Sequence, residues 1–305
     1  MIIKNAREIA ERHSSEKIVL VASRRTDMPR FYTDEIITGL QNGAFHPQGL
    51  MQKMWRLEFQ PEDIHSIGLW SQDFGSWISE RKKLAGYGYK FWYRFTILPD
   101  DPVCKPKAPT VAEQLIQLEK LCEHDGPETI SVFADPIMKF RHTGESEWNY
   151  NFSADSLRPV FKKLKELGIG NLSLSVIDYY GKVKKRAERF GVEFFYPDDK
   201  TEDGKAEIKN MMQVFNETAA LYGIKIKTCC EKFISDTGLS EAGSCVNGKR
   251  LIEIFGPGAS IKTDSGQRKK FGCGCTCSVD IGRYIEYGTW SHHCGHDCPQ
   301  CYARK

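Results

Sequence analysis

The chain has 305 residues, of which 40% are apolar and 27% charged, and its formal net charge is only +3. This balance is typical of a globular protein with a sizeable core and lacks the strongly basic character of a dedicated nucleic-acid binder, although it does not exclude a nucleic-acid substrate. No apolar run reaches the roughly 18 residues that cross a membrane, and the N-terminus carries charges where a signal peptide needs an apolar stretch. We therefore expect a cytoplasmic protein without a membrane partner.

Short apolar runs recur from residue 17 to about residue 228. Several are rich in β-branched or aromatic residues and lack strict alternation, which is typical of parallel strands covered on both faces. The predicted strands span residues 18–22, 64–69, 90–97, 129–133, 172–177 and 224–227.

Amphipathic segments lie between these runs. Residues 33–41 are expected to form a helix with Thr33 as its N-cap and with Ile36, Ile37 and Leu40 at helical spacing. Further helices are expected over residues 111–123, 156–167 and 206–222. This alternation of strand and helix predicts a parallel α/β fold, a TIM-like barrel that is either closed or partly open.

Cysteine usage changes sharply along the chain. Of its 11 cysteines, only Cys104 and Cys122 precede residue 228. Disulfides are disfavoured in the cytoplasm, so clustered cysteines there indicate metal binding or chemistry. We expect an α/β barrel over residues 1–228 and an irregular, cysteine-rich segment over residues 229–305 that binds an iron–sulfur centre and packs on the barrel mouth.

Polar residues follow the first predicted strand, where α/β barrels carry their chemistry. Ser23, Arg24, Arg25 and Asp27 form this group. Two arginines and an aspartate are suited to bind a carboxylate, a phosphate or the polar groups of a sulfonium cofactor. A structural Arg–Asp pair that closes the barrel is an equal alternative.

Two aspartates, Asp135 and Asp178, directly follow later strands, so both are expected at the same mouth. Either is a candidate catalytic proton acceptor or a partner for a ribose, and helix N-capping is the ordinary alternative. Trp70 is a candidate stacking surface, although a core position is favoured. The lysine-rich stretches 162–165 and 182–189 are interpreted as solvated helix faces in preference to RNA contacts.

The last cysteines, Cys294, Cys298 and Cys301, follow the spacing Cys-x3-Cys-x2-Cys. Three thiolates can hold three irons of a four-iron, four-sulfur cluster and leave the fourth iron open, whereas electron carriers usually fill that position with a further cysteine. In radical enzymes S-adenosylmethionine binds to such an open iron. His292, His293 and His296 make a mixed Cys/His zinc site the competing interpretation, and we favour surface positions for these histidines.

Several ordered motifs resemble the DUF1848 family. They are Ser23-Arg-Arg-Thr-Asp27, Asp135-Pro-Ile137, Asp178-Tyr-Tyr180, Cys230-Glu231, Gln267-Arg268, Cys273-Gly-Cys275-Thr-Cys277-Ser-Val-Asp280-Ile-Gly282-Arg-Tyr284 and the terminal Cys294, Cys298, Cys301, Tyr302 and Ala303. The resemblance implies a TIM-barrel-like fold related to radical S-adenosylmethionine enzymes, with the cluster motif moved to the C-terminus. Those enzymes usually carry an aromatic residue just before the third cysteine, where it packs against adenine. This chain has Gln300 there and Tyr302 one place beyond Cys301, which makes Tyr302 the candidate for that contact.

A second metal centre is expected because Cys230, Cys245, Cys273 and Cys275 match family positions. Four thiolates suit an auxiliary iron–sulfur cluster or a structural zinc, and the Cys-x-Cys pair favours the cluster. Cys229 and Cys277 are alternative ligands.

Three functions follow from these patterns. The favoured one is a radical S-adenosylmethionine-type enzyme of unknown substrate, reduced by a donor such as ferredoxin or flavodoxin. The second is an iron–sulfur redox or sensor protein without radical chemistry. The third is a zinc-stabilised barrel that binds a nucleic acid or another protein.

Overall fold

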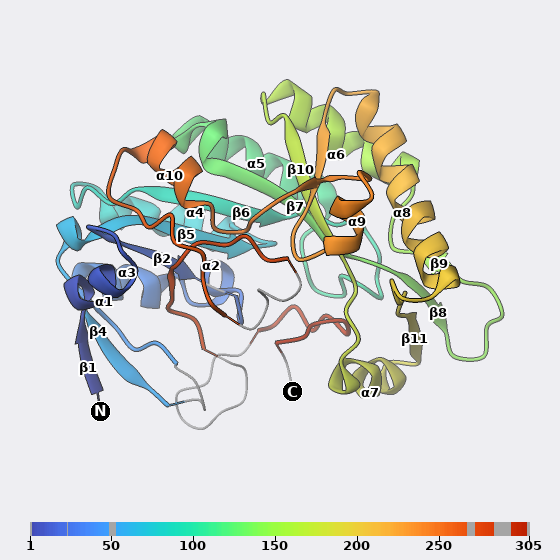
Figure 1. Ribbon diagram of the computed structural model, residues 1–305, viewed down its shortest axis with the longest axis horizontal. Coiled ribbons are helices and arrows are strands. Elements are labelled where there is room, and N and C mark those ends of the chain that lie inside the picture. Colours follow the sequence, from blue (N-terminus) through green and yellow to red (C-terminus); the bar gives the residue numbers. More distant parts are fainter. Residues whose placement is uncertain (1, 23, 49–52, 267–271, 284–293, 304–305) are drawn as a thin grey trace.

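The computed structural model describes residues 2–22, 24–48, 53–266, 272–283 and 294–303 (Figure 1). Its centre is an 8-stranded sheet in which all neighbouring strands are parallel. In spatial order the strands are β13 (Glu241–Ala242), β12 (Lys225–Thr228), β10 (Asn171–Val176), β7 (Ile130–Ile137), β6 (Phe91–Thr96), β5 (Ile64–Ser71), β2 (Ile18–Ala22) and β14 (Val279–Asp280). The predicted α/β fold is therefore confirmed, and each of the predicted strands coincides with a strand of this sheet.

The strand order is that of a barrel cut open at one seam. From β2 to β13 the strands follow one another in sequence order, and β14 then returns beside β2, where Val279 pairs with Leu20. Within the described part of the chain β13 and β14 do not pair with each other, so the sheet stays open between its two edges. The first and last strands are nevertheless neighbours, which brings the end of the cysteine-rich segment to the first strand.

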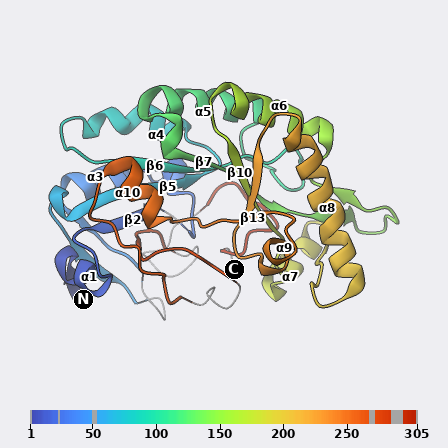
Figure 2. The ribbon, with the colours of Figure 1, turned by 45° about the horizontal axis from the view of Figure 1, so that its top comes forward.

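Helices cover the outer face of the sheet (Figure 2). The covering helices are α3 (Thr33–Gln41), α4 (Gly75–Glu80), α5 (Val111–Asp125), α6 (Ala154–Glu166) and α8 (Glu202–Ala220). Their apolar faces share one core with alternate strand residues such as Ile18 and Leu20, whereas Val19 and Val21 point to the opposite face. Successive side chains of a strand alternate between faces, so a strand buried on both faces reads as a continuous apolar run.

The inner face is covered by the cysteine-rich segment. That segment is less irregular than predicted, because it contains α9 (Lys232–Asp236) and α10 (Gly248–Phe255) and supplies both edge strands. Leu251 of α10 packs with Trp70 and Trp92 in a second apolar cluster. Gly68 is required beneath it, since a Cβ atom at this position would lie 2.2 Å from the Trp92 ring.

Smaller elements surround this body. Two 3-stranded sheets consist of β1 (Ile2–Asn5), β4 (Trp55–Glu58) and β3 (Ala44–Phe45), and of β11 (Val192–Phe195), β8 (Lys139–His142) and β9 (Asn149–Tyr150). The remaining helices are α1 (Ala6–Arg12), α2 (Met28–Phe31), α7 (Gly181–Arg189) and the 3-10 turns η2 (Pro61–Asp63), η3 (Arg81–Leu84) and η4 (Pro127–Thr129). Among the described residues no helix combines the length and the apolar character that crossing a membrane requires.

The predicted N-cap of the helix at residues 33–41 is wrong. Thr33 is the first helical residue and Tyr32 is the N-cap, which makes no side-chain capping bond. The Thr33 hydroxyl instead donates to the carbonyl of Pro29, 2.5 Å away in the preceding helix α2. Because the connection from α2 to α3 is short, the Thr33 hydroxyl bonds to the Pro29 carbonyl and does not cap the helix.

Candidate metal centre

A cavity of about 410 Å³ lies where the parallel strands end at their carboxyl termini. Every described residue that the sequence predicted for the site lines it, namely Arg24, Arg25, Asp27, Asp135, Asp178, Tyr302, Cys230, Cys245, Cys273, Cys275, Cys294, Cys298 and Cys301. Ser23 lies outside the described residues. The fold thus brings both cysteine groups and the polar strand ends into one chamber, while their chemical roles stay predictions.

The loop that carries the terminal cysteines is held by several elements. Arg186 of α7 is buried and donates to the carbonyls of Pro299, at 3.1 Å, and Cys301, at 2.7 Å. The Gln300 amide donates to the carbonyl of Cys104, and the Tyr302 hydroxyl donates to the carbonyl of Arg24 at 2.5 Å. These contacts fix the backbone on both sides of Cys301 without using its sulfur.

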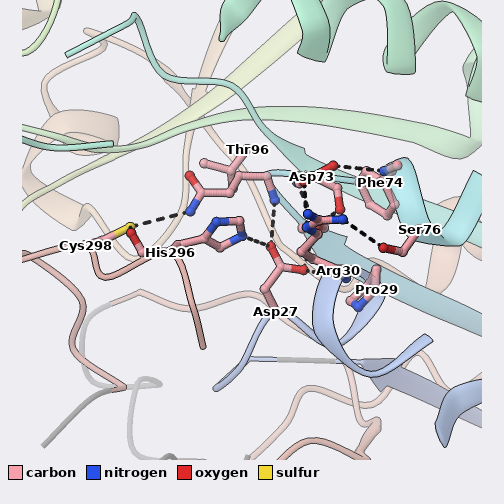
Figure 3. Close-up of polar contacts among 12 residues, drawn as sticks. Asp27, Pro29, Arg30, Asp73, Phe74, Ser76, Thr96, His296 and Cys298 are labelled. Atoms are coloured by element: carbon pink, nitrogen blue, oxygen red, sulfur yellow. Dashed lines mark hydrogen bonds and ion pairs between the residues drawn. The ribbon is translucent and has the colours of Figure 1, made fainter. Parts of the chain in front are cut away.

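Asp27 connects this loop to the first strands (Figure 3). Its Oδ2 accepts hydrogen bonds from Nε2 of His296, at 2.8 Å, and from the backbone amide of Gln72. Its Oδ1 accepts from the Ser71 hydroxyl and from the backbone amide of Arg30. His296 is 2% exposed, so the expected surface position is wrong for this histidine. His292 and His293 lie outside the described residues. Because four donors occupy its two oxygens, Asp27 positions the loop.

The environment of the terminal thiols disfavours free thiolates. Burial raises the pKa of Cys294 and of Cys298 to about 12. The Gln72 side-chain amide lies 3.5 Å from Sγ of Cys298, where it favours negative charge on the sulfur. Buried thiols of this kind ionise when a metal cation replaces the proton.

The second cysteine group comes from separated parts of the cysteine-rich segment. Cys229 and Cys230 follow β12, Cys245 precedes α10, and Cys273 and Cys275 precede β14. The sulfurs of Cys229, Cys245 and Cys275 all lie within 4.8 Å of one another. Three chain segments therefore meet at one thiol-rich point.

Cys229 is the hub of this group. Its Sγ lies 3.1 Å from that of Cys245 and 3.8 Å from that of Cys230, and hydrogen bonds with Cys230, Cys245, Cys273 and Cys275 raise its pKa. Hydrogen bonding from Cys229 in turn lowers the pKa of Cys275 to about 6. Cys277 is buried away from this cavity, and that burial raises its pKa.

A guanidinium stack forms the wall between the strands. Arg94 lies over the rings of Trp70, at 4.6 Å, and Phe133, at 3.9 Å, and forms an ion pair with Asp135. Thr96 also donates to Asp135, at 3.1 Å. Trp70 is a core residue, 8% exposed, and also a stacking surface for a second guanidinium group, because that of Arg24 lies over its ring at 5.5 Å from the centroid.

The two arginines after β2 form structural ion pairs, as the alternative interpretation predicted, but with aspartates other than Asp27, and the Arg24 guanidinium lies 3.7 Å from Asp264. The Arg25 guanidinium lies 3.7 Å from Asp280 of β14, and the Arg24 backbone amide donates to the same carboxylate. Burial raises the pKa of Asp280, although Arg25 and Arg24 act in the opposite direction. Neither predicted catalytic aspartate is a helix N-cap, since Asp135 lies within β7 and Tyr180 caps α7.

The favoured site prediction did not include Arg94, His296 or Arg186, and it named Cys229 only as an alternative ligand. Arg94 alternates with buried neighbours in β6 and shares a face with Thr96, a period-two signal that was present in the sequence. Cys229 is next to the predicted ligand Cys230 in the sequence, and His296 lies between the predicted ligands Cys294 and Cys298. Arg186 carried no signal of its own within the lysine-rich stretch, because its burial arises only from the docked loop.

Comparison with curated proteins finds no match. A family model described as a domain of unknown function, DUF1848, matches residues 19–303, from the first strand of the sheet to the terminal cysteine loop. The match covers both cysteine groups and every strand of the central sheet. The chain therefore belongs to the DUF1848 family.

Proposed function

We propose that the protein is an iron–sulfur enzyme of the radical S-adenosylmethionine type, with Cys294, Cys298 and Cys301 as ligands of a four-iron cluster. The observation that carries this proposal is that all three cysteines line the cavity at the carboxyl ends of the strands. A cluster with one open iron, once S-adenosylmethionine is bound to it, supplies the reductive cleavage of a carbon–sulfur bond. The walls of the cavity would then exclude water and hold the substrate.

The donor set suits such a cluster. Among the described residues the terminal sulfurs do not form a compact group within 4.8 Å, as the second cysteine group does. In a four-iron cluster each thiolate binds a different iron, so its sulfurs stand at separate corners. Three separated sulfurs on a loop that is fixed by several contacts meet this requirement of a four-iron cluster.

The charges of the cavity favour cationic occupants. Its lining includes three arginines, Arg24, Arg25 and Arg94, against the five aspartates Asp27, Asp135, Asp178, Asp264 and Asp297. Thiolates would add further negative charge. Metal ions and a sulfonium cofactor therefore complement this cavity better than an anion does.

The polar residues divide into two tasks under this proposal. Asp135 holds the Arg94 guanidinium over Trp70 and so shapes the cavity wall. Asp178 is exposed at the rim of the cavity and is the proposed group for proton exchange with a substrate. Tyr302 stacks on Tyr180 with ring centroids 6.1 Å apart, which offers an aromatic edge for an adenine.

The electron donor is proposed to dock on α7. Lys182, Lys184, Lys185 and Arg189 are exposed on this helix, and none of them has a carboxylate within 4.0 Å in the described parts of the chain. The buried side of the same helix binds the Cys301 carbonyl through Arg186. An acidic carrier of the ferredoxin or flavodoxin kind would thus dock one helix diameter, about 10 Å, from the terminal cysteines. Lys184→Glu combined with Lys185→Glu should slow reduction by flavodoxin several-fold and leave reduction by dithionite unchanged; equal rates with flavodoxin would contradict this docking site.

The decisive experiment is metal and sulfide analysis after anaerobic purification, with the paramagnetic resonance spectrum of the reduced protein recorded before and after S-adenosylmethionine is added. We expect about four irons and four sulfides at the terminal site, and a spectrum that the cofactor alters. Cys298→Ala should lose this iron, whereas Cys122→Ala, on α5 and outside both groups, should retain it. Zinc without sulfide in the wild-type protein would refute the enzyme proposal, and unchanged iron in Cys298→Ala would refute the ligand assignment.

The auxiliary iron–sulfur cluster predicted at the other cysteines is not part of this proposal. The short distances between the sulfurs of that group favour a single metal ion over a cluster, and this argument does not depend on the terminal cysteines.

A further inference from the structure

The second cysteine group is too compact for a cluster. Two of its sulfur pairs are separated by 3.1 and 3.8 Å, and three of its sulfurs lie mutually within 4.8 Å. A tetrahedral ion with metal–sulfur bonds of about 2.3 Å holds its thiolates about 3.8 Å apart. A four-iron cube would instead separate its thiolates by the width of the cube. We propose that Cys229, Cys230, Cys245, Cys273 and Cys275 provide the ligands for one thiolate-bound tetrahedral ion of the zinc class.

The backbone at Cys230 supports this assignment. Adjacent residues of an extended chain point to opposite sides, so two consecutive cysteines do not normally reach one ion. Cys230 adopts φ 65°, in the left-handed region that non-glycine residues rarely use, and this turn brings the Cys230 and Cys229 sulfurs to 3.8 Å. Such a conformation is unfavourable for a residue other than glycine and persists where the surroundings require it. The turn keeps the Cys230 sulfur within reach of the ion that Cys229 would bind, whether Cys230 is the fourth ligand or the spare thiol.

Cys229 belongs to every ligand set that the group can form. Cys245 and Cys275 complete the compact triangle with it, and either Cys230 or Cys273 supplies the fourth thiolate. The remaining thiol stays beside the ion as a spare ligand. A site filled by four protein thiolates is closed, so its role is structural.

Nearby arginines offset the charge of such a site. A divalent ion with four thiolates carries a net charge of about −2. Although burial opposes it, Asp135 and the Cys245 and Cys229 thiolates raise the pKa of Arg94, and Asp280, Cys275 and Cys245 act likewise on Arg24. Two guanidinium groups thus lie against the thiolates and stabilise their ionised form.

The site also explains how the inner face of the sheet is covered. Its ligands join the end of β12, the loop before α10 and the loop before β14. One ion there cross-links the segments that provide both edge strands of the sheet. A closed metal site can contribute folding free energy that a segment with few core residues cannot obtain from packing.

The test uses the full-length protein with Cys298→Ala, which removes the terminal centre and leaves this group intact. After anaerobic purification we expect about one zinc per chain, with almost no iron or sulfide. Replacement of zinc by cobalt(II) should give thiolate charge-transfer bands and the intense visible bands of a tetrahedral ion. About four irons with sulfide in this variant would overturn the single-ion assignment in favour of an auxiliary cluster.

Matched cysteine variants locate the ligands. Cys229→Ser should weaken zinc binding at least 10-fold in a chelator competition, whereas Cys277→Ser, two residues after Cys275 but outside the cavity, should leave it unchanged. Double replacement of Cys230 and Cys273 by serine should also abolish tetrahedral cobalt bands. Unchanged zinc affinity in Cys229→Ser would overturn the assignment. One zinc in a wild-type protein that contains no iron would support this inference while refuting the proposed enzyme, so the two can fail separately.

Discussion

At the scale of single residues, Asp27 supports the loop of the proposed terminal metal ligands and is not itself a proposed ligand. Both of its oxygens are used by backbone and side-chain donors from α2, from the end of β5 and from the terminal loop. A carboxylate that orients a histidine through one ring nitrogen is the usual support of a metal or catalytic site. Here the supported histidine lies between Cys294 and Cys298, so Asp27 sets the conformation of the loop.

Asp27→Asn should lower the free energy of unfolding by about 2 kcal/mol, because one acceptor oxygen becomes an amide that faces buried donors. Urea denaturation under anaerobic conditions measures this change. His296→Ala should cost much less once Asp27 is already replaced, and a double-mutant cycle reports that coupling. Strictly additive losses of stability would show that the contact between Asp27 and His296 contributes no stability. Asp178→Asn, at the exposed rim, is the matched control and should change the free energy of unfolding little.

At this scale the sequence predicts which strand ends meet, but not which of two adjacent side chains enters the site. Strand ends converge in a parallel sheet, so Asp135, Asp178 and Arg24 could be expected at one mouth from the order of the elements alone. That the sulfurs of both Cys229 and Cys230 lie in the second cysteine group depends on φ at Cys230, a backbone angle that no spacing rule encodes. For the same reason His296 was misplaced, since its burial depends on a partner 269 positions away.

At the scale of elements, α7 has two functions on opposite faces. Its buried face presents Arg186 to the terminal loop. Its exposed face carries lysines that form no ion pair within the described residues, although Glu188 follows Lys184 and Lys185 at i+4 and i+3, whereas α6 and α8 do contain such pairs. The sequence predicted a solvated, lysine-rich helix, which describes the outer face correctly. It missed the inner face because one arginine among several basic residues gives no sign of burial.

Arg186→Leu should reduce the iron content of the terminal site by more than half while the second site keeps its metal. The substitution leaves the carbonyls of Pro299 and Cys301 without their donor, so the loop loses its fixed conformation. Metal analysis of the purified variant checks this outcome. Arg189→Leu on the exposed face of the same helix is the control, and equal iron loss in both variants would point to a general effect on α7.

The prediction of elements succeeded where apolar runs were long. The six predicted strands of the central sheet and the helices α3, α5, α6 and α8 have enough residues to show a pattern. β13 and β14 have two residues each, and α10 has eight between glycines, so local patterns could not reveal them. Their positions depend on packing against β2, β12 and Trp70, which is tertiary information.

At the scale of the whole molecule, the sheet depends on its cysteine-rich segment at both edges. β13 extends β12 and β14 extends β2, and the second cysteine group lies in the chain between and around these strands. Barrel closure by strand pairing is absent from the described part of the chain. Under the single-ion proposal, the metal would link the two edges in place of the missing strand pairs.

Removal of metal with a chelator under reducing conditions should lower Tm and loosen only this segment. Amide hydrogen exchange should rise in β13, α10 and β14, while β5, β6 and β7 keep their protection because their core is made with the outer helices. Exchange measured by mass spectrometry separates these regions. A uniform rise in exchange over the whole sheet would contradict a metal that stabilises this segment alone. Cys229→Ser should show the increased exchange in β13, α10 and β14 before any chelator is added.

The close approach of Cys229 and Cys245 has a consequence for exposure to air. Their sulfurs are 3.1 Å apart, about 1 Å more than the length of a disulfide bond. Loss of two protons and two electrons to oxygen would join them and remove two ligands at once. Metal and oxygen thus compete for the same pair of thiols, and a preparation that meets oxygen first must be reduced before it can accept metal.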